Sequence, residues 1–136
     1  MANYKLVDLE GIGPQIAAKF EKIDIRRTDQ LLKACAKKSG RKHVAEQTGL
    51  TPEKVLKYAN MADLYRIKGV GSEYSELLEA TGVDTVAELA TRNPENLTTA
   101  LVETNEKKKL VRRIPVIKMV RKWVAQAKEL PRILEY

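Results

Sequence analysis

The sequence has little of what disulfide scaffolds, zinc sites and membrane proteins require. Its 136 residues include one cysteine, Cys35, and one histidine, His43. A single cysteine excludes an internal disulfide, and one cysteine with one histidine cannot form a Cys/His cluster of zinc-ligand spacing. Cys35 lies four residues after Leu31 on one face of an expected helix, so we predict a buried, inert thiol.

Long apolar runs are also missing. No stretch approaches the roughly 18 apolar residues that a membrane span needs. No apolar run at the N-terminus resembles a signal peptide, so we expect a cytoplasmic protein. Hydrophobic residues make up 43% of the chain, which is ordinary for a globular protein and predicts a small folded core.

Acidic residues are outnumbered by basic ones. The chain carries 25 Lys and Arg against 18 Asp and Glu, a formal net charge of +7. This balance suits a polyanionic partner or an acidic membrane surface.

The two halves of the chain repeat one pattern. A shift of 58 residues aligns the glycines and the apolar positions of the first half with those of the second. The aligned pairs include Gly11 with Gly69, Gly13 with Gly71, Leu6 with Leu64, and Leu31 with Leu89. Because the apolar skeleton is kept while the surface changes, we predict a structural duplication with units at residues 1–63 and 64–136.

The apolar residues follow helical spacing, and no segment shows the alternating pattern of a β-strand. The expected fold is therefore all-α, with about eight or nine short helices in one compact body. Helices are expected to start at Pro14, Ser72, Pro52 and Pro94 and after Pro115, and one is expected to stop at Gly49. Thr28 and Asp84 are expected to be N-caps.

Each pair of glycines encloses one apolar residue just before a helix. We call residues 11–13 hairpin 1 and residues 69–71 hairpin 2. Glycine permits backbone angles or close approaches that a side chain would block, and Ile12 or Val70 should anchor the turn in the core. The exposed amides then lie beside a helix N-terminus, where unpaired N–H groups and the helix dipole favour an anion such as a DNA phosphate.

The stretches "LVDLEGIGPQIAAKF" and, more loosely, "LYRIKGVGSEYSELL" resemble the helix-hairpin-helix motif of DNA repair, recombination and replication proteins. That motif grips the DNA backbone without reading sequence. Nearly the whole chain, including "AEQTGL", "ANMADL", "RIKGVG" and "GVDTVAELA", also resembles a bacterial domain-of-unknown-function family of small proteins built from such hairpins. The resemblance allows a monovalent cation held by hairpin carbonyls, although no residue here demands one; no other cofactor and no metal are expected.

The two hairpins differ in charge. Hairpin 1 is followed by Pro14, by Ala17, which allows close helix packing, and by Lys19. Hairpin 2 is followed by carboxylates at Glu73, Glu76 and Glu79, which repel phosphate and are partly offset by Lys68. Hairpin 2 is therefore predicted to be the weaker DNA contact.

Two stretches of the chain carry several lysines and arginines and no acidic residue, whereas an ordinary solvent-exposed face mixes both charges. The first basic cluster comprises Lys33, Lys37, Lys38, Arg41 and Lys42. The second basic cluster comprises Lys107, Lys108, Lys109, Arg112, Arg113, Lys118, Arg121 and Lys122.

These features together predict non-enzymatic, sequence-tolerant binding of double-stranded DNA, with neither a membrane nor a small-molecule substrate as partner. The residues expected to contact DNA are Gly11, Ile12, Gly13, Gln15, Lys19, Lys68, Gly69, Val70, Gly71, Ser72, Lys37, Lys38, Arg41, Lys42, Lys107, Lys108, Lys109, Arg112 and Arg113. The main alternative is a protein-interaction or scaffold module of the same fold, in which the hairpins serve structure only.

Three further alternatives have weaker support. The segment "AEQTGLTPEKVLKYA" resembles a helix-turn-helix that would direct Glu53, Lys54 and Lys57 toward a major groove. An apolar stripe of Val116, Ile117, Val120 and Val124 beside cations could lie on an anionic membrane. A DNA repair lyase or glycosylase could use Asp24 or Asp29, but no nucleophile has a plausible base and the chain is short for a base-flipping pocket.

Overall fold

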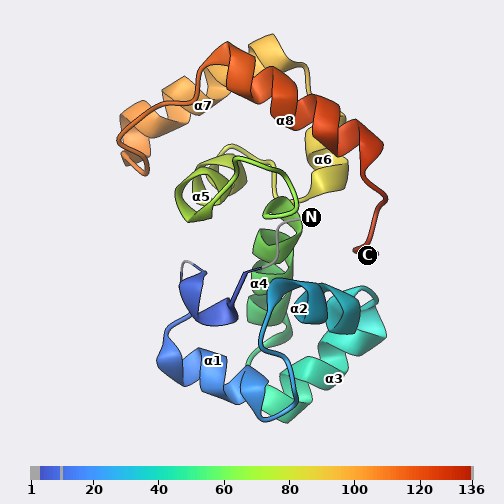
Figure 1. Cartoon of the computed structure of the whole chain (residues 1–136). Helices are drawn as coiled ribbons and strands as arrows, with labels where there is room; N and C mark the ends of the chain where they lie inside the picture. The colour runs from blue at the N-terminus through green and yellow to red at the C-terminus, as the bar shows by residue number, and fades with distance from the viewer. Residues whose placement is uncertain (1–3, 10, 136) are drawn as a thin grey trace.

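Helices account for nearly all regular structure in this computed structural model, which describes residues 4–9 and 11–135. In chain order they are η1 (Leu6–Asp8), a 3-10 turn, then α1 (Pro14–Glu21), α2 (Thr28–Cys35), α3 (Lys38–Thr48), α4 (Pro52–Leu64), α5 (Ser72–Ala80), α6 (Val86–Ala90), α7 (Pro94–Lys108) and α8 (Ile117–Glu129) (Figure 1). Within the described ranges the only extended pairing is an isolated antiparallel bridge between Lys5 and Arg27. The prediction of an all-α fold is confirmed.

The helix boundaries follow local chemistry. Pro14, Pro52 and Pro94 each occupy a first helical position, where the missing N–H removes no hydrogen bond. Gly49 ends α3 in the left-handed conformation with φ 77°, and its N–H donates to the Ala45 carbonyl. The starts and the stop predicted at these residues are confirmed.

Two predicted N-caps are wrong by one residue. Arg27, not Thr28, caps α2, and the Thr28 hydroxyl accepts instead from the Tyr4 amide at 3.1 Å. Thr85, not Asp84, caps α6, where its side chain accepts from the Glu88 amide at 3.1 Å. In both cases the neighbouring residue adopts the extended backbone that an N-cap needs, and the sequence pattern could not choose between the two.

The core consists of two clusters of buried side chains, with α4 between them (Figure 1). The first cluster is built mainly from η1 and α1 to α4, and includes Phe20, Leu31 and Val55. The second is built mainly from α5 to α8, and includes Leu78 and Trp123. Helix α4 serves both, because Met61 belongs to the first cluster and Leu64 to the second.

The tail after α8 runs back to the first cluster. Leu134 is buried there, and the Glu135 amide donates to the Ala36 carbonyl at 2.7 Å. This return links the end of the chain to the helices of the first half.

Helix α8 uses its apolar stripe inside the protein rather than on the surface. Val120 and Val124 are buried in the second cluster, Ile117 is half-buried, and Val116 is exposed. None of the helices in the described residues combines the length and the apolar character that crossing a bilayer would take.

Candidate functional site

The first glycine of each hairpin is required by the backbone. Gly11 has φ 81° and Gly69 has φ 94°, a left-handed region that side chains disfavour. The next residue is a buried anchor, with Ile12 2% and Val70 1% exposed. Its amide closes a tight turn in both cases, from Ile12 to the Leu9 carbonyl and from Val70 to the Ile67 carbonyl, each at 3.1 Å.

The second glycine of each hairpin has no such requirement. Gly13 (φ −85°, ψ −179°) and Gly71 (φ −104°, ψ −164°) have extended backbone that any residue adopts. A β carbon added to either glycine would have no neighbouring atom within 4 Å. The expectation that backbone angle or close packing demands all four glycines is therefore wrong for Gly13 and Gly71.

Gly13 and Gly71 are the N-caps of α1 and α5, and neither helix receives a side-chain cap at this position. Glycine offers no oxygen to the amides of the first turn. In α1, Pro14 has no N–H, so the amides of Gln15 and Ile16 are the ones left without a cap. Gln15 is exposed, and so is Lys19 one turn further along α1.

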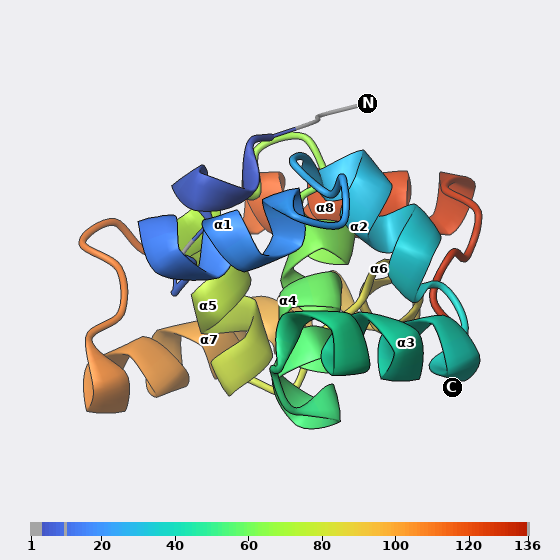
Figure 2. The same ribbon diagram turned by 90° about the horizontal axis from the view of Figure 1, so that it is seen from below.

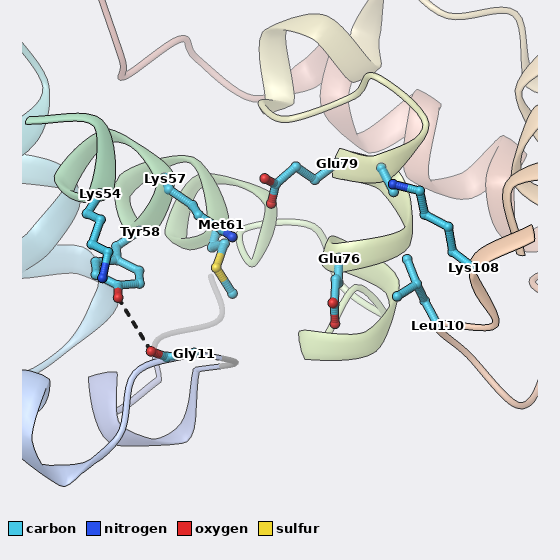
Figure 3. Close-up of a pocket in the computed structure, with 10 residues that line it drawn as sticks. Gly11, Lys54, Lys57, Tyr58, Met61, Glu76, Glu79, Lys108 and Leu110 are labelled. Carbon is cyan, nitrogen blue, oxygen red and sulfur yellow. Dashed lines mark hydrogen bonds between the residues drawn. The ribbon is translucent and has the colours of Figure 1, made fainter.

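Hairpin 1 borders a cleft of about 540 Å³ between α4 and α5 (Figure 3). The Tyr58 hydroxyl donates to the Gly11 carbonyl at 3.4 Å, which ties the hairpin to α4. Burial raises the pKa of Tyr58, so the hydroxyl stays protonated as a donor. The cleft is lined by Gly11, Lys54, Lys57, Tyr58, Met61, Glu76, Glu79, Ala80, Lys108 and Leu110.

Charges of both signs line this cleft. Lys54 and Lys57 extend from α4, and Lys108 extends from the end of α7. Figure 3 shows Glu79 reaching from α5 toward Lys57, with Glu76 one turn away. None of the ion pairs within residues 4–9 and 11–135 joins these five side chains. The lysines of the helix-turn-helix alternative thus lie beside hairpin 1.

Hairpin 2 is held by α8. Gln126 Oε1 accepts from the Lys68 amide at 2.9 Å, and Gln126 Nε2 donates to the Lys68 carbonyl at 3.3 Å. Lys68 itself is exposed. The Ser72 hydroxyl, expected to contact DNA, is engaged with the Tyr65 hydroxyl and with the Asp8 carbonyl at 3.5 Å.

The second basic cluster runs from the last turn of α7 through the loop between α7 and α8 and along α8. The Tyr74 hydroxyl donates to the Arg113 carbonyl at 3.0 Å, which fixes this loop against the first turn of α5. The loop and the start of α1 lie on the same side of the molecule in both views, although Figure 1 shows the loop in the upper half and α1 in the lower half (Figures 1 and 2). The exposed cations here are Lys107, Lys108, Lys109, Arg112 and Arg113.

One member of that cluster has an acidic partner. Arg121 Nη2 lies 3.0 Å from Glu95 Oε1, and both side chains are more than half exposed. The hydrogen bond from Arg121 lowers the pKa of Glu95.

The first basic cluster lies at the other end of the first half. Lys37 is the N-cap of α3, and Lys38 and Lys42 are exposed in the first two turns, which contain no acid. Figures 1 and 2 show α3 beginning at the opposite end from the start of α1. This cluster therefore does not flank hairpin 1.

Arg41 differs from the other cations expected to contact DNA. It is 6% exposed, and its Nη1 donates to the Cys35 carbonyl at 3.0 Å, at the end of α2. Gly40 permits this junction, because a β carbon there would lie 2.2 Å from the Ala34 carbonyl oxygen. The structure thus corrects the expectation for Arg41, whose side chain satisfies a helix C-terminus.

Sequence reasoning missed the aromatic and amide side chains around hairpin 2. Tyr74, Trp123 and Gln126 come from α5 and α8, and only helix packing brings them to residues 68 and 69. The sole tryptophan of the chain was the one signal that could have drawn attention to this position.

Metal-ligating side chains do not gather in the part of the chain that the structure describes: no three or more His, Cys, Asp or Glu form a group there that could hold an ion. The site thus defines a small all-helical protein with two glycine hairpins, each opening a helix with a bare N-cap. The chain belongs to the family described as Domain of unknown function (DUF4332), whose profile matches residues 10–130. Neither a curated protein nor a solved structure matches it.

Proposed function

We propose that this protein binds double-stranded DNA without enzymatic activity and with little dependence on sequence. In this proposal residues 1–63 and 64–136 are helix-hairpin-helix units related by duplication. The amides of Ile12 and Val70 are used within the turns, so amides at the start of α1 and α5 hold backbone phosphates, and nearby lysines and arginines supply longer-range attraction.

The bare N-caps carry the proposal. Thr51, Thr85 and Asn93 cap α4, α6 and α7 with side-chain oxygens, whereas Lys37 and Val116 begin α3 and α8 without a side-chain cap, as the hairpin glycines do. The backbone angles at Gly13 and Gly71, and the open space around them, would also admit serine, threonine or asparagine. The fold itself therefore does not require glycine at these two positions. An anion that approaches the first-turn amides from outside does explain the glycines, because a capping side chain would occupy those amides.

The charges near hairpin 1 support an anionic partner. Lys54, Lys57 and Lys108 line the cleft that reaches Gly11. Neutralising about five phosphates would give a slope of about −4 to −5 for log affinity against log salt concentration. The first basic cluster, at the other end, adds to the net charge of +7 rather than to the hairpin contact.

A protein-interaction module is the second candidate, and the carboxylates of the cleft favour it. Glu76 and Glu79 face the same open space as the lysines and would repel a DNA backbone. A peptide with both charges would suit such a lining better than a polyanion does.

Fluorescence anisotropy with a labelled duplex of arbitrary sequence, across a salt series, separates the two candidates. We expect binding that weakens steeply with salt. Absence of duplex binding at moderate salt would leave only the protein-interaction candidate. Borohydride trapping on a duplex with an abasic site is expected to give no crosslink; a crosslink would instead indicate a lyase.

The variant Gly13→Asp tests the hairpin itself. Its carboxylate should cap α1, raise stability by a few tenths to about 1 kcal/mol, and weaken duplex binding about tenfold by occupying the phosphate site. The matched control is Asn93→Asp, which adds the same charge at the N-cap of α7. Gly13→Asn caps without charge and should fall between Gly13→Asp and the wild type. If the wild type, Gly13→Asp, Gly13→Asn and Asn93→Asp all bound the duplex with equal affinity, hairpin 1 would be excluded as a DNA contact.

A further inference from the structure

Trp123 has an unused hydrogen-bond donor at hairpin 2. Its side chain is 2% exposed, and its ring packs against Tyr74 with centroids 5.2 Å apart. A β carbon added to Gly69 would lie 3.2 Å from Nε1, so the indole nitrogen faces the hairpin. No described residue accepts a hydrogen bond from this nitrogen, and it is not among the atoms buried without a partner, so Nε1 is open to solvent and to a ligand although the rest of the ring is buried.

Trp123 and Gly69 both line a surface hollow of about 330 Å³, which we call the Trp123 hollow. It is lined by Lys68, Gly69, Met119, Lys122, Trp123 and Gln126. Met119 and Trp123 supply apolar surface to the lining, and Lys68 and Lys122 are its exposed cations. Unlike the cleft at hairpin 1, this lining contains no carboxylate.

The hollow is also held in shape before any ligand arrives. Gln126 makes two hydrogen bonds to the Lys68 backbone, which fix hairpin 2 against α8. The Tyr74 ring packs against Trp123, and the Tyr74 hydroxyl is held in place by its hydrogen bond to the Arg113 carbonyl. A preorganised donor between two cations binds an anion at a lower entropic cost than flexible lysines alone.

We propose that the Trp123 hollow binds a sugar-phosphate unit. A phosphate oxygen accepts from Trp123 Nε1–H between the ammonium groups of Lys68 and Lys122, and the sugar lies against the apolar part of the lining. The hollow then makes hairpin 2, despite the carboxylates that follow it, a phosphate contact assisted by α8. The identity of the polymer, double-stranded DNA, rests on the proposed function.

Tryptophan emission tests the proposal directly, because Trp123 is the only tryptophan in the chain. The probes are a duplex of arbitrary sequence, inorganic phosphate and deoxyribose 5-phosphate. The test variant Lys68→Gln/Lys122→Gln changes two exposed residues and should fold normally. The matched control, Lys118→Gln/Lys128→Gln, removes two exposed charges of α8 outside the hollow. Trp123→Phe removes the N–H, and its thermal unfolding shows whether it remains folded.

We expect the duplex to shift the emission of the wild type and of the control. The test variant should lose that shift, bind roughly tenfold more weakly, and have a salt slope smaller by about 1 to 2. A folded Trp123→Phe should also bind more weakly than the wild type.

The other outcomes separate the two proposals. If the duplex binds without changing the emission, and the test variant binds like the control, the Trp123 hollow is not a contact and the proposed function stands. If no duplex binds, but inorganic phosphate or deoxyribose 5-phosphate shifts the emission with the same dependence on the two lysines, the hollow is a small-anion site and the proposed function is wrong. If no probe binds, both proposals fail.

Discussion

Arg66 Nη1 lies 2.9 Å from Asp63 Oδ1, and this ion pair is almost fully buried, with side-chain exposures of 1% and 3%. Asp63 Oδ2 accepts from the Val86 amide at 2.7 Å, at the start of α6. Arg66 Nη2 donates to the Pro131 carbonyl at 2.6 Å, in the tail after α8. One ion pair therefore joins α4, α6 and the C-terminal tail.

Replacing one partner of this pair should destabilise the protein strongly. Asp63→Ala leaves the Arg66 guanidinium buried without its carboxylate, so we expect a loss of about 3–5 kcal/mol in the free energy of unfolding, measured by urea denaturation. The control is Glu88→Gln, which breaks the more exposed pair with Arg92 and should cost less than about 1 kcal/mol. The double variant Asp63→Leu/Arg66→Met should recover most of the loss; if it is as unstable as Asp63→Ala, the unpaired charge is not the cause.

The C-terminal tail should contribute to the stability of the first half. Leu134 is 2% exposed and lies in the first cluster, so Leu134→Ala should lower the free energy of unfolding by about 2–5 kcal/mol. The exposed Val116 provides the comparison, since Val116→Ala should change stability by less than about 0.5 kcal/mol. Equal urea midpoints for the two variants would mean that the tail does not contribute to the stability of the first half.

The glycines of each hairpin should differ in their tolerance to substitution. Gly11→Ala and Gly69→Ala force a side chain into the left-handed region, and the second also brings a β carbon to 3.2 Å from Trp123 Nε1. We expect each to cost about 1–3 kcal/mol. Gly13→Ser and Gly71→Ser should be neutral or slightly stabilising, because serine can cap the helix. Thermal unfolding of the four variants measures the contrast, and uniform losses at all four positions would contradict this geometry.

Cys35 should react with thiol reagents only when the protein opens. It is 0% exposed, and burial raises its pKa to about 12, while the Arg41 charge acts in the opposite direction. The unfolded thiol ionises near 9, so its contribution to folding stability is present below that pH and is lost as pH rises toward 12. Labelling by iodoacetamide at mildly alkaline pH should follow the unfolding equilibrium in a urea series. Rapid labelling without urea would show that the thiol is accessible in the folded protein.

Much of the fold could be predicted from short stretches of sequence. Pro52 and Pro94 start helices, Gly49 ends one, and Ile12 and Val70 anchor the hairpins, because each effect acts within a few residues. The buried position of Cys35, predicted from helical spacing, is also confirmed. The duplication, the domain boundary and DNA binding stay predictions.

The candidate site could be predicted only in part. Both hairpins have the turn geometry that the glycines indicate, but charge near a motif in sequence was a poor guide to exposure and position. Arg41 is buried at the end of α2, and the first basic cluster lies away from hairpin 1. Lys54 and Lys57, assigned from sequence to another element, line the cleft beside Gly11.

The sequence by itself determined where helices begin and end and where the chain turns, since those choices depend on the φ preferences and hydrogen-bonding groups of adjacent residues. Only the tertiary structure decided which distant groups meet: Trp123 and Gln126 at hairpin 2, Tyr58 at hairpin 1, and Asp63 and Arg66 at the C-terminal tail. Such meetings depend on how whole helices pack around two apolar clusters, and no local pattern specifies that packing.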